Sequence, residues 1–352
     1  MYKLDKTVGL VTVATPLDQN LALLDVDEHL SAESLAVIHE GFVNVIPILN
    51  TARRSKYVPL SQGCDRGKGS IKQVKWVKLQ GETIFVVLSD SGLQVYDAEI
   101  SDIKFYHACR ETGDENSYTI GVCVVKNDTL CIGTHLGTVW MLRGNESNTN
   151  FVVTGRFYAH DEAVTLMDGF EEYMVTSSDI MTYMWLYKGN SFEIVRKLNV
   201  SGLFSKPTAL KIMNCLTFIG YESGEFCIFD FFDEEYFART IGHKLKITAI
   251  DFSALTGYIL TASQDSFVKI WKFEQDASEA KILHSIYNDD GPICGGAFLN
   301  YTCTEFCTVI ADSVNVKFYL KWDTDDEPNE PKAKDVNEAK EEGMPLGKEI
   351  LV

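Results

Sequence analysis

Seven stretches of the chain share one pattern of apolar and polar positions. Each has an apolar run, a tight polar turn and a second alternating run that ends in a large apolar residue, as in ILTASQDSFVKIWKF. Alternation with a period of two predicts strands, and small residues in the turns favour tight hairpins. The end positions, 42 to 50 residues apart, are Ile46, Tyr96, Leu142, Trp185, Phe229, Trp271 and Phe318.

Further short strands flank most of these hairpins. QVKWVKL, TALKIM and ITAIDF precede hairpins, and DIKFYHA and KILHSIY follow them. Four short strands in a period of roughly 40–45 residues are typical of a β-propeller blade. We therefore predict an all-β fold, a single seven-bladed propeller over residues 1–321.

The last copy stops after its third strand, VNVKFYL, and a charged tail follows. An open blade edge would expose unpaired backbone groups, so the missing outer strand should come from elsewhere in the chain. The segment KTVGLVTVAT, residues 6–15, is the best donor. The ring is therefore predicted to close by pairing one end of the chain with the other.

Composition and charge limit the class of partner. The chain is 45% apolar with a net charge of −18, which suits a large core and disfavours nucleic acid and anionic membranes. No run of about 18 uncharged apolar residues is present, so we expect no membrane insertion. Nine scattered cysteines, mostly in apolar runs, indicate a reducing compartment. We expect a cytoplasmic protein, with cilium- or vesicle-associated pools left open.

Two copies carry a family resemblance. Asp179 and Asp265 each stand six residues before a tryptophan, with a serine eight residues before it and a histidine further upstream. With these residues the chain resembles WD-repeat propellers, in which such residues form a buried relay. The resemblance implies a WD-type propeller and a structural relay of His160, Ser177, Asp179, Trp185, His243, Ser263, Asp265 and Trp271. A buried indole N–H needs an acceptor and a buried carboxylate needs donors, so a structural role suits Asp265 better than a catalytic one.

No other motif supports catalysis. The loop SQGCDRGKGS departs from a phosphate-binding loop in its glycine spacing and lacks a βαβ context. No cysteine or histidine spacing matches a metal site. We predict no enzyme activity, no cofactor and no metal.

The predicted function is a protein–protein interaction scaffold or adaptor, a role that the resemblance also implies. A long loop on a rigid ring is a common binding element. We therefore expect docking residues in the basic linker after the first copy and on the face that carries the hairpin turns. These are Arg53, Arg54, Lys56, Arg66, Lys68, His39, Glu40, His135 and Glu222.

Alternative functions remain. One is a reader of basic peptides such as histone-like tails, which an aromatic cage or an acidic ring at the channel mouth would support. Others are a propeller enzyme, which needs converging carboxylates in the channel, and a substrate receptor of a ubiquitin ligase. Residues 322–352 are predicted to be a disordered acidic tail, with ten acids and four lysines in 323–352. The sequence does not decide the partner or the oligomeric state.

Overall fold

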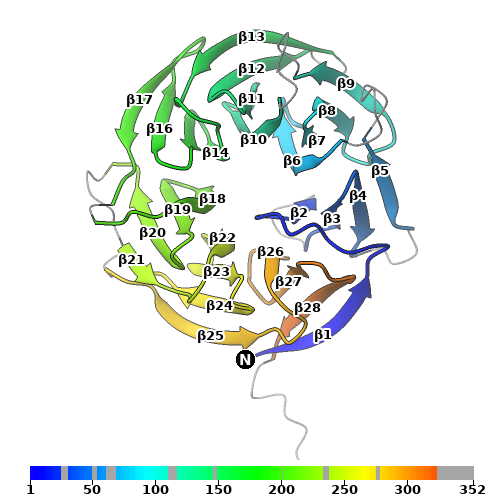
Figure 1. The fold of residues 1–352 in the computed structure, drawn as a ribbon, viewed down its shortest axis with the longest axis vertical. Coiled ribbons are helices and arrows are strands. Elements are labelled where there is room, and N and C mark those ends of the chain that lie inside the picture. The colour runs from blue at the N-terminus through cyan, green and yellow to red at the C-terminus, as the bar shows by residue number, and fades with distance from the viewer. Residues whose placement is uncertain are drawn as a thin grey trace, which may run out of the picture.

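Seven four-stranded antiparallel sheets form a closed ring in the computed structural model (Figure 1). The structure describes residues 1–24, 31–49, 54–60, 69–109, 117–145, 148, 150–200, 202–232, 238–274 and 278–322. Across these ranges the regular elements are all strands. The seven-bladed propeller predicted from the repeat is confirmed.

The first four blades take their strands in chain order, from the centre of the ring outward. Blade one has β2 (Ala22–Leu24), β3 (Ser34–His39), β4 (Phe42–Pro47) and β5 (Lys56–Pro59). Blade two has β6 (Ile71–Leu79), β7 (Glu82–Ser89), β8 (Gly92–Asp97) and β9 (Ile103–Ala108). Blade three has β10 (Thr119–Val125), β11 (Thr129–Thr134), β12 (Thr138–Gly144) and β13 (Phe151–Tyr158). Blade four has β14 (Leu166–Phe170), β15 (Tyr173–Ser177), β16 (Thr182–Tyr187) and β17 (Phe192–Lys197).

The last three blades complete the ring. Blade five has β18 (Pro207–Met213), β19 (Leu216–Tyr221), β20 (Glu225–Asp230) and β21 (Ala238–Ile241). Blade six has β22 (Ile247–Ser253), β23 (Tyr258–Ser263), β24 (Phe267–Lys272) and β25 (Lys281–Tyr287). Blade seven has β26 (Ile293–Phe298), β27 (Glu305–Ile310), β28 (Asn315–Lys321) and, as its outer strand, β1 (Tyr2–Gly9).

Closure by the N-terminal strand is therefore confirmed, although its position differs from the prediction of residues 6–15. Strand β1 pairs with β28 from Tyr2 opposite Lys321 to Gly9 opposite Asn315. The ladder ends there because β28 begins at Asn315, and the chain then turns inward. Leu10 and Ala14 donate backbone hydrogen bonds to the hairpin turn of blade seven, and Thr15 donates to Ile38 in blade one.

The hydrophobic core lies between blades. Among the described residues, each of seven buried clusters combines residues of two neighbouring blades. One example is Val86 and Leu88 of blade two with Val122 and Trp140 of blade three. The cluster between blades seven and one joins Phe318 to Leu35 and so seals the ring where the two chain ends meet. All seven end positions of the repeat are buried. The large apolar residue that recurs along the chain thus packs one blade against the next.

The described part of the chain contains no helix long and apolar enough to cross a bilayer. The predicted tail beyond Trp322 lies outside the described residues.

Candidate functional site

The relay in blade six joins its tryptophan to the loop that enters the blade. Trp271 donates its indole N–H to Thr261 Oγ1 over 2.9 Å, and Thr261 Oγ1 lies 2.8 Å from His243 Nε2. His243 Nδ1 lies 3.1 Å from both carboxylate oxygens of Asp265. The carboxylate accepts, so we assign the proton to Nδ1, and Thr261 then donates to Nε2. Ser263 is not part of this series of hydrogen bonds; its hydroxyl accepts the backbone N–H of Asp265 in the turn.

In blade four the relay is shorter. Trp185 donates to Thr176 Oγ1 over 2.8 Å, and the same oxygen lies 2.8 Å from His160 Nε2. Asp179 does not take part, because its exposed carboxylate pairs with Lys206 at 2.8 Å. Ser177 instead bonds to Thr182 at 2.8 Å. Ser177, Asp179 and Ser263 were predicted to be members of the relays, and for these three residues the prediction is wrong.

The physical reason is the length of the turn. In blade six the last paired residues before the turn are Ala262 and Val268, with five residues between them. In blade four they are Ser177 and Thr182, with four residues between them. Counting back from the tryptophan therefore aligned Asp179 with Asp265 although the missing residue moves Asp179 away from the histidine. The linking threonines were missed, yet each lies two residues before a turn serine, Ser178 or Ser263. Counting from that serine would have found them.

Burial keeps both relay histidines neutral. It lowers the pKa of His160 to about 4 and that of His243 below its ordinary value, even though Asp265 favours the charged form. Burial alone would raise the pKa of Asp265. Hydrogen bonds from His243 and from the backbone N–H groups of Lys244 and Phe267 outweigh it and hold that pKa below its usual range. Asp265 therefore fastens two loops as an ionised acceptor.

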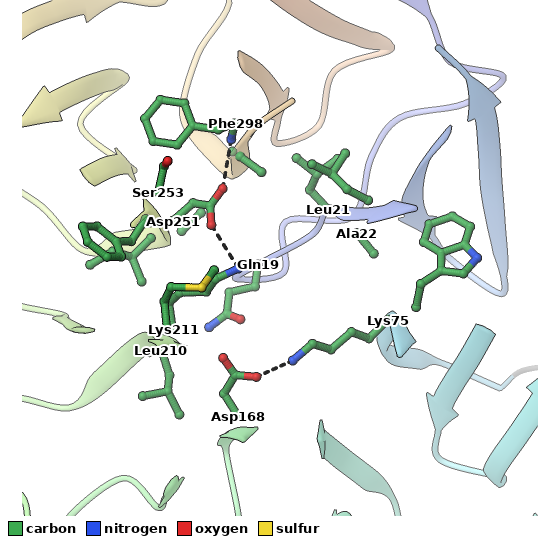
Figure 2. Close-up of a pocket in the computed structure, with 18 of the residues that line it drawn as sticks. Gln19, Leu21, Ala22, Lys75, Asp168, Leu210, Lys211, Asp251, Ser253 and Phe298 are labelled. Carbon is green, nitrogen blue, oxygen red and sulfur yellow. Dashed lines mark hydrogen bonds and ion pairs between the residues drawn. The ribbon is translucent and has the colours of Figure 1, made fainter. Parts of the chain in front are cut away.

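The innermost strands enclose a central cavity of about 260 Å³ (Figure 2). Lys75 of β6 reaches across β10 to Asp168 of β14, with 2.6 Å between Nζ and the carboxylate. Lys211 of β18 pairs with Asp251 of β22 at 3.0 Å. These charges occupy inner strands that are otherwise mostly apolar, and that contrast is a signal that the sequence offered.

Each channel carboxylate also binds the next blade. Asp168 accepts the backbone N–H of Ile212 at 2.8 Å. Asp251 accepts that of Phe298 at 3.0 Å (Figure 2). Both carboxylates are thus already paired with a lysine and a backbone donor. Among the described residues, no group of three or more His, Cys, Asp or Glu is placed to hold a metal ion. The channel is lined by compensated charges that tie blades together.

The turns between the second and third strands of the blades, together with the loops that join blades, form one face of the ring, which we call the hairpin-turn face. Glu40 and Glu222 are exposed there. His39 is fully buried: its Nδ1 lies 3.0 Å from Thr12 Oγ1, and its ring stacks on Phe42. His135 is half-buried and packs beside Tyr118. Of the four residues predicted for this face, His39 is therefore not available for docking.

The basic linker is not one loop. Strand β5 divides it, so Arg54 and Lys56 lie at the end of blade one opposite its hairpin turn. Lys56 lies 3.8 Å from Glu99. Arg53, Arg66 and Lys68 lie outside the described residues. The predicted single basic docking loop is thus corrected for its described members.

Sequence reasoning missed an exposed apolar group on the hairpin-turn face. Phe204, in the loop from blade four to blade five, is 100% exposed, and Ile180 in the neighbouring turn is 67% exposed. Ile241, the last residue of β21, and Leu245, on the loop from blade five to blade six, are also exposed. An apolar residue between Gly202 and Pro207, outside any alternating run, was the available signal.

Comparisons with known proteins agree with this architecture. A family model described as WDR54 matches residues 1–320. The chain is similar to WD repeat-containing protein 54 of Mus musculus, with 23% identity over 90% of this chain and 98% of the relative. It is also similar to WD repeat domain 54 of Rattus norvegicus, with 24% identity over 85% of this chain and 93% of the relative. A chain of the crystal structure of the mitotic checkpoint complex shares the fold, with a TM-score of 0.72, 13% identity and coverage of 91% and 92%.

Proposed function

The chain belongs to the WDR54 family, and from that membership and its propeller fold we propose that it acts as a non-enzymatic adaptor that presents its hairpin-turn face to protein partners. A WD-repeat propeller is in general a scaffold for protein interactions. The finer proposal concerns which face docks, and by what means.

One observation carries the choice of face. Phe204 is fully exposed, yet the loop that bears it is bonded to the turns on both sides. Exposing a phenylalanine side chain to water has an unfavourable hydration free energy, which a partner that covers it would remove. A fixed loop also loses little entropy when a partner binds. The hairpin-turn face is therefore suited to passive docking.

The channel supports the non-enzymatic part of the proposal. A general acid or base needs access to substrate and a free proton-transfer position. Asp168 and Asp251 are each engaged by a lysine and by a backbone N–H. The adaptor proposal therefore includes no catalytic residue and no cofactor.

The alternative functions gain less support. A reader of basic tails at the channel mouth would be favoured by an acidic ring, but the carboxylates of Asp18 and Asp179 are paired there with Lys246 and Lys206. For a ubiquitin-ligase receptor, no described surface carries a distinguishing feature.

A cytoplasmic location is part of the proposal. Apart from Cys109, the described cysteines are free thiols, and six of these seven are buried. Burial raises the pKa of Cys227 and of Cys294 to about 12, which keeps these thiols protonated. Thiols of this kind suit a reducing compartment. Imaging of the tagged full chain checks the location, and a signal confined to the secretory pathway would contradict it.

The adaptor proposal is tested by quantitative co-purification from cells. One variant reverses charge on the hairpin-turn face (Glu40→Lys, Asp161→Lys, Glu222→Lys), and a matched variant reverses three exposed acids elsewhere (Glu82→Lys, Asp102→Lys, Glu193→Lys). We expect a defined set of proteins to be lost only from the first variant. Equal losses from both, or no partner in stoichiometric amount with the unmodified chain, would count against the proposal.

A further inference from the structure

Four exposed apolar side chains on blades four to six define what we call the Phe204 patch: Ile180, Phe204, Ile241 and Leu245. They are 67%, 100%, 79% and 52% exposed. Ile180 lies in the hairpin turn of blade four, and Phe204 lies in the next loop around the ring. Leu245 follows on the far side of the turn of blade five. The four residues thus follow one another along a single sector of the hairpin-turn face.

The loops that carry the patch are fastened to the turns between them. Lys206 pairs with Asp179 at 2.8 Å, Ser205 Oγ accepts the N–H of Ser223 at 2.9 Å, and Glu222 donates its N–H to the Lys206 carbonyl. Leu203, beside Phe204, packs into the core between blades four and five. The loop is therefore anchored from below while Phe204 points into solvent.

The second loop is held in the same way. The carbonyl of Gly224, in the turn of blade five, accepts the N–H groups of Gly242 and His243. Gly224 has φ +84, and a Cβ at that position would lie 2.3 Å from the His243 carbonyl oxygen, so the close approach requires glycine. His243 is itself fixed by the relay through Asp265 and Thr261. Leu245 is thus positioned by the same network that locks blade six.

Charge around the patch is negative on balance. Asp161, Glu162 and Glu222 are exposed and form no ion pair among the described residues. Lys206 and Lys246 are already neutralised by Asp179 and Asp18. Lys197 and Lys244 are also exposed and form no ion pair among the described residues, so three unpaired acids face two unpaired lysines. The net charge of −18 acts over the whole chain. A ligand with positive charge is therefore favoured at long range as well as at the rim.

We propose that the Phe204 patch binds linear segments of partner proteins in which an apolar side chain is flanked by lysine or arginine. The apolar side chain of the segment covers Phe204 and Ile180, and the flanking cations pair with Glu222 and with Asp161 or Glu162. This inference rests on the adaptor function proposed above and names the chemistry of its partner. A second copy of this chain fits less well, because it would bring two acidic surfaces together.

The test uses the purified full chain and a phage-displayed library of random twelve-residue peptides. Panning runs against the unmodified chain, and enriched peptides are synthesised and titrated by fluorescence anisotropy. The test variants are Phe204→Ala and Glu222→Lys. The matched controls are Phe232→Ala, a phenylalanine 74% exposed beyond the far end of β20, and Glu193→Lys on outer strand β17. Unchanged thermal unfolding of each variant establishes that it folds.

We expect enriched peptides to carry an apolar residue between basic residues. Phe204→Ala should weaken their binding about ten- to a hundredfold, as truncation of an interface anchor does. Glu222→Lys should weaken it about three- to tenfold, with a smaller dependence on salt. Phe232→Ala and Glu193→Lys should bind as the unmodified chain does.

Other results overturn the inference. These are peptides that bind Phe204→Ala as well as the unmodified chain, enrichment of acidic or uncharged peptides, and no enrichment at all. Sedimentation that shows a dimer lost in Phe204→Ala would assign the patch to self-association instead. If no basic peptide binds while native partners still depend on the hairpin-turn face, this inference fails and the adaptor function stands.

Discussion

Replacing Thr261 with valine tests whether the relay of blade six holds the blade together. The side chain of Thr261 is fully buried, accepts the indole N–H of Trp271 and donates to His243 Nε2. Valine has nearly the same volume but no hydroxyl, so Thr261→Val removes two hydrogen bonds without creating a cavity.

The magnitude follows from the groups left behind. Trp271 and His243 are each 5% exposed, so water does not replace the missing partner. A buried polar group without a partner costs about 1–3 kcal/mol, and two such groups give a destabilisation of about 2–6 kcal/mol. Thr261→Ser keeps the hydroxyl and loses one methyl group, which costs about 1 kcal/mol.

Urea unfolding, followed by tryptophan fluorescence and by far-UV circular dichroism, measures the difference between the two variants. A double-mutant cycle with Trp271→Phe isolates the bond to the indole, and we expect a coupling of about 1–2 kcal/mol. If Thr261→Val is as stable as Thr261→Ser, or if the coupling is near zero, the relay does not stabilise blade six and the argument is refuted.

Burial lowers the pKa of His160 from 6.5 to about 4, so as pH falls below 6.5 the unfolded chain takes up a proton first. The free energy of unfolding therefore falls by about 3 kcal/mol between pH 6.5 and 4. Urea unfolding across this range should show a weaker dependence of that free energy on pH for His160→Gln than for the unmodified chain. An equal dependence would contradict the assignment. Asp168→Ala should cost about 2–3 kcal/mol, because it leaves the N–H of Ile212 without an acceptor and also breaks the ion pair. Lys75→Met should cost at most about 1 kcal/mol, because the side chain of Lys75 is one-third exposed. Equal thermal shifts of the two variants would argue against this division. Deletion of residues 1–9 removes the outer partner of β28, so size-exclusion chromatography should show aggregates. The control Leu4→Thr, at an exposed position of β1, should remain monodisperse. A stable, folded deletion variant would mean that β1 is dispensable.

The repeat was readable from sequence because its physical cause is local. A large apolar residue recurs once per blade, and in the structure every one of these residues packs between two blades. The missing strand of blade seven was also predictable, since an unpaired edge needs a partner. Only its limits differed, because the length of β28 sets how far β1 can pair.

The relay shows where spacing misleads. Asp179 and Asp265 each stand six residues before their tryptophan in the sequence. The turn of blade four is shorter by one residue, so Asp179 does not reach His160 and pairs with Lys206 instead. His39 shows the same limit, since its turn position suggested exposure and its ring is buried against Phe42. Hydrogen bonds reach about 3 Å, so one residue of turn length decides whether two groups meet.

By itself, the sequence determined the class of fold, the number of blades, the closure of the ring by its own N-terminus and the acidic character of the surface. These depend on periodicity and composition, which are properties of the chain in order. Only the tertiary structure decided that Lys75 and Asp168 meet across the channel and that Thr261 links Trp271 to His243. It also decided that Phe204 stands exposed on a loop bonded to the turn that carries Ile180. Such contacts join residues tens of positions apart, and their geometry arises only when the blades close into a ring.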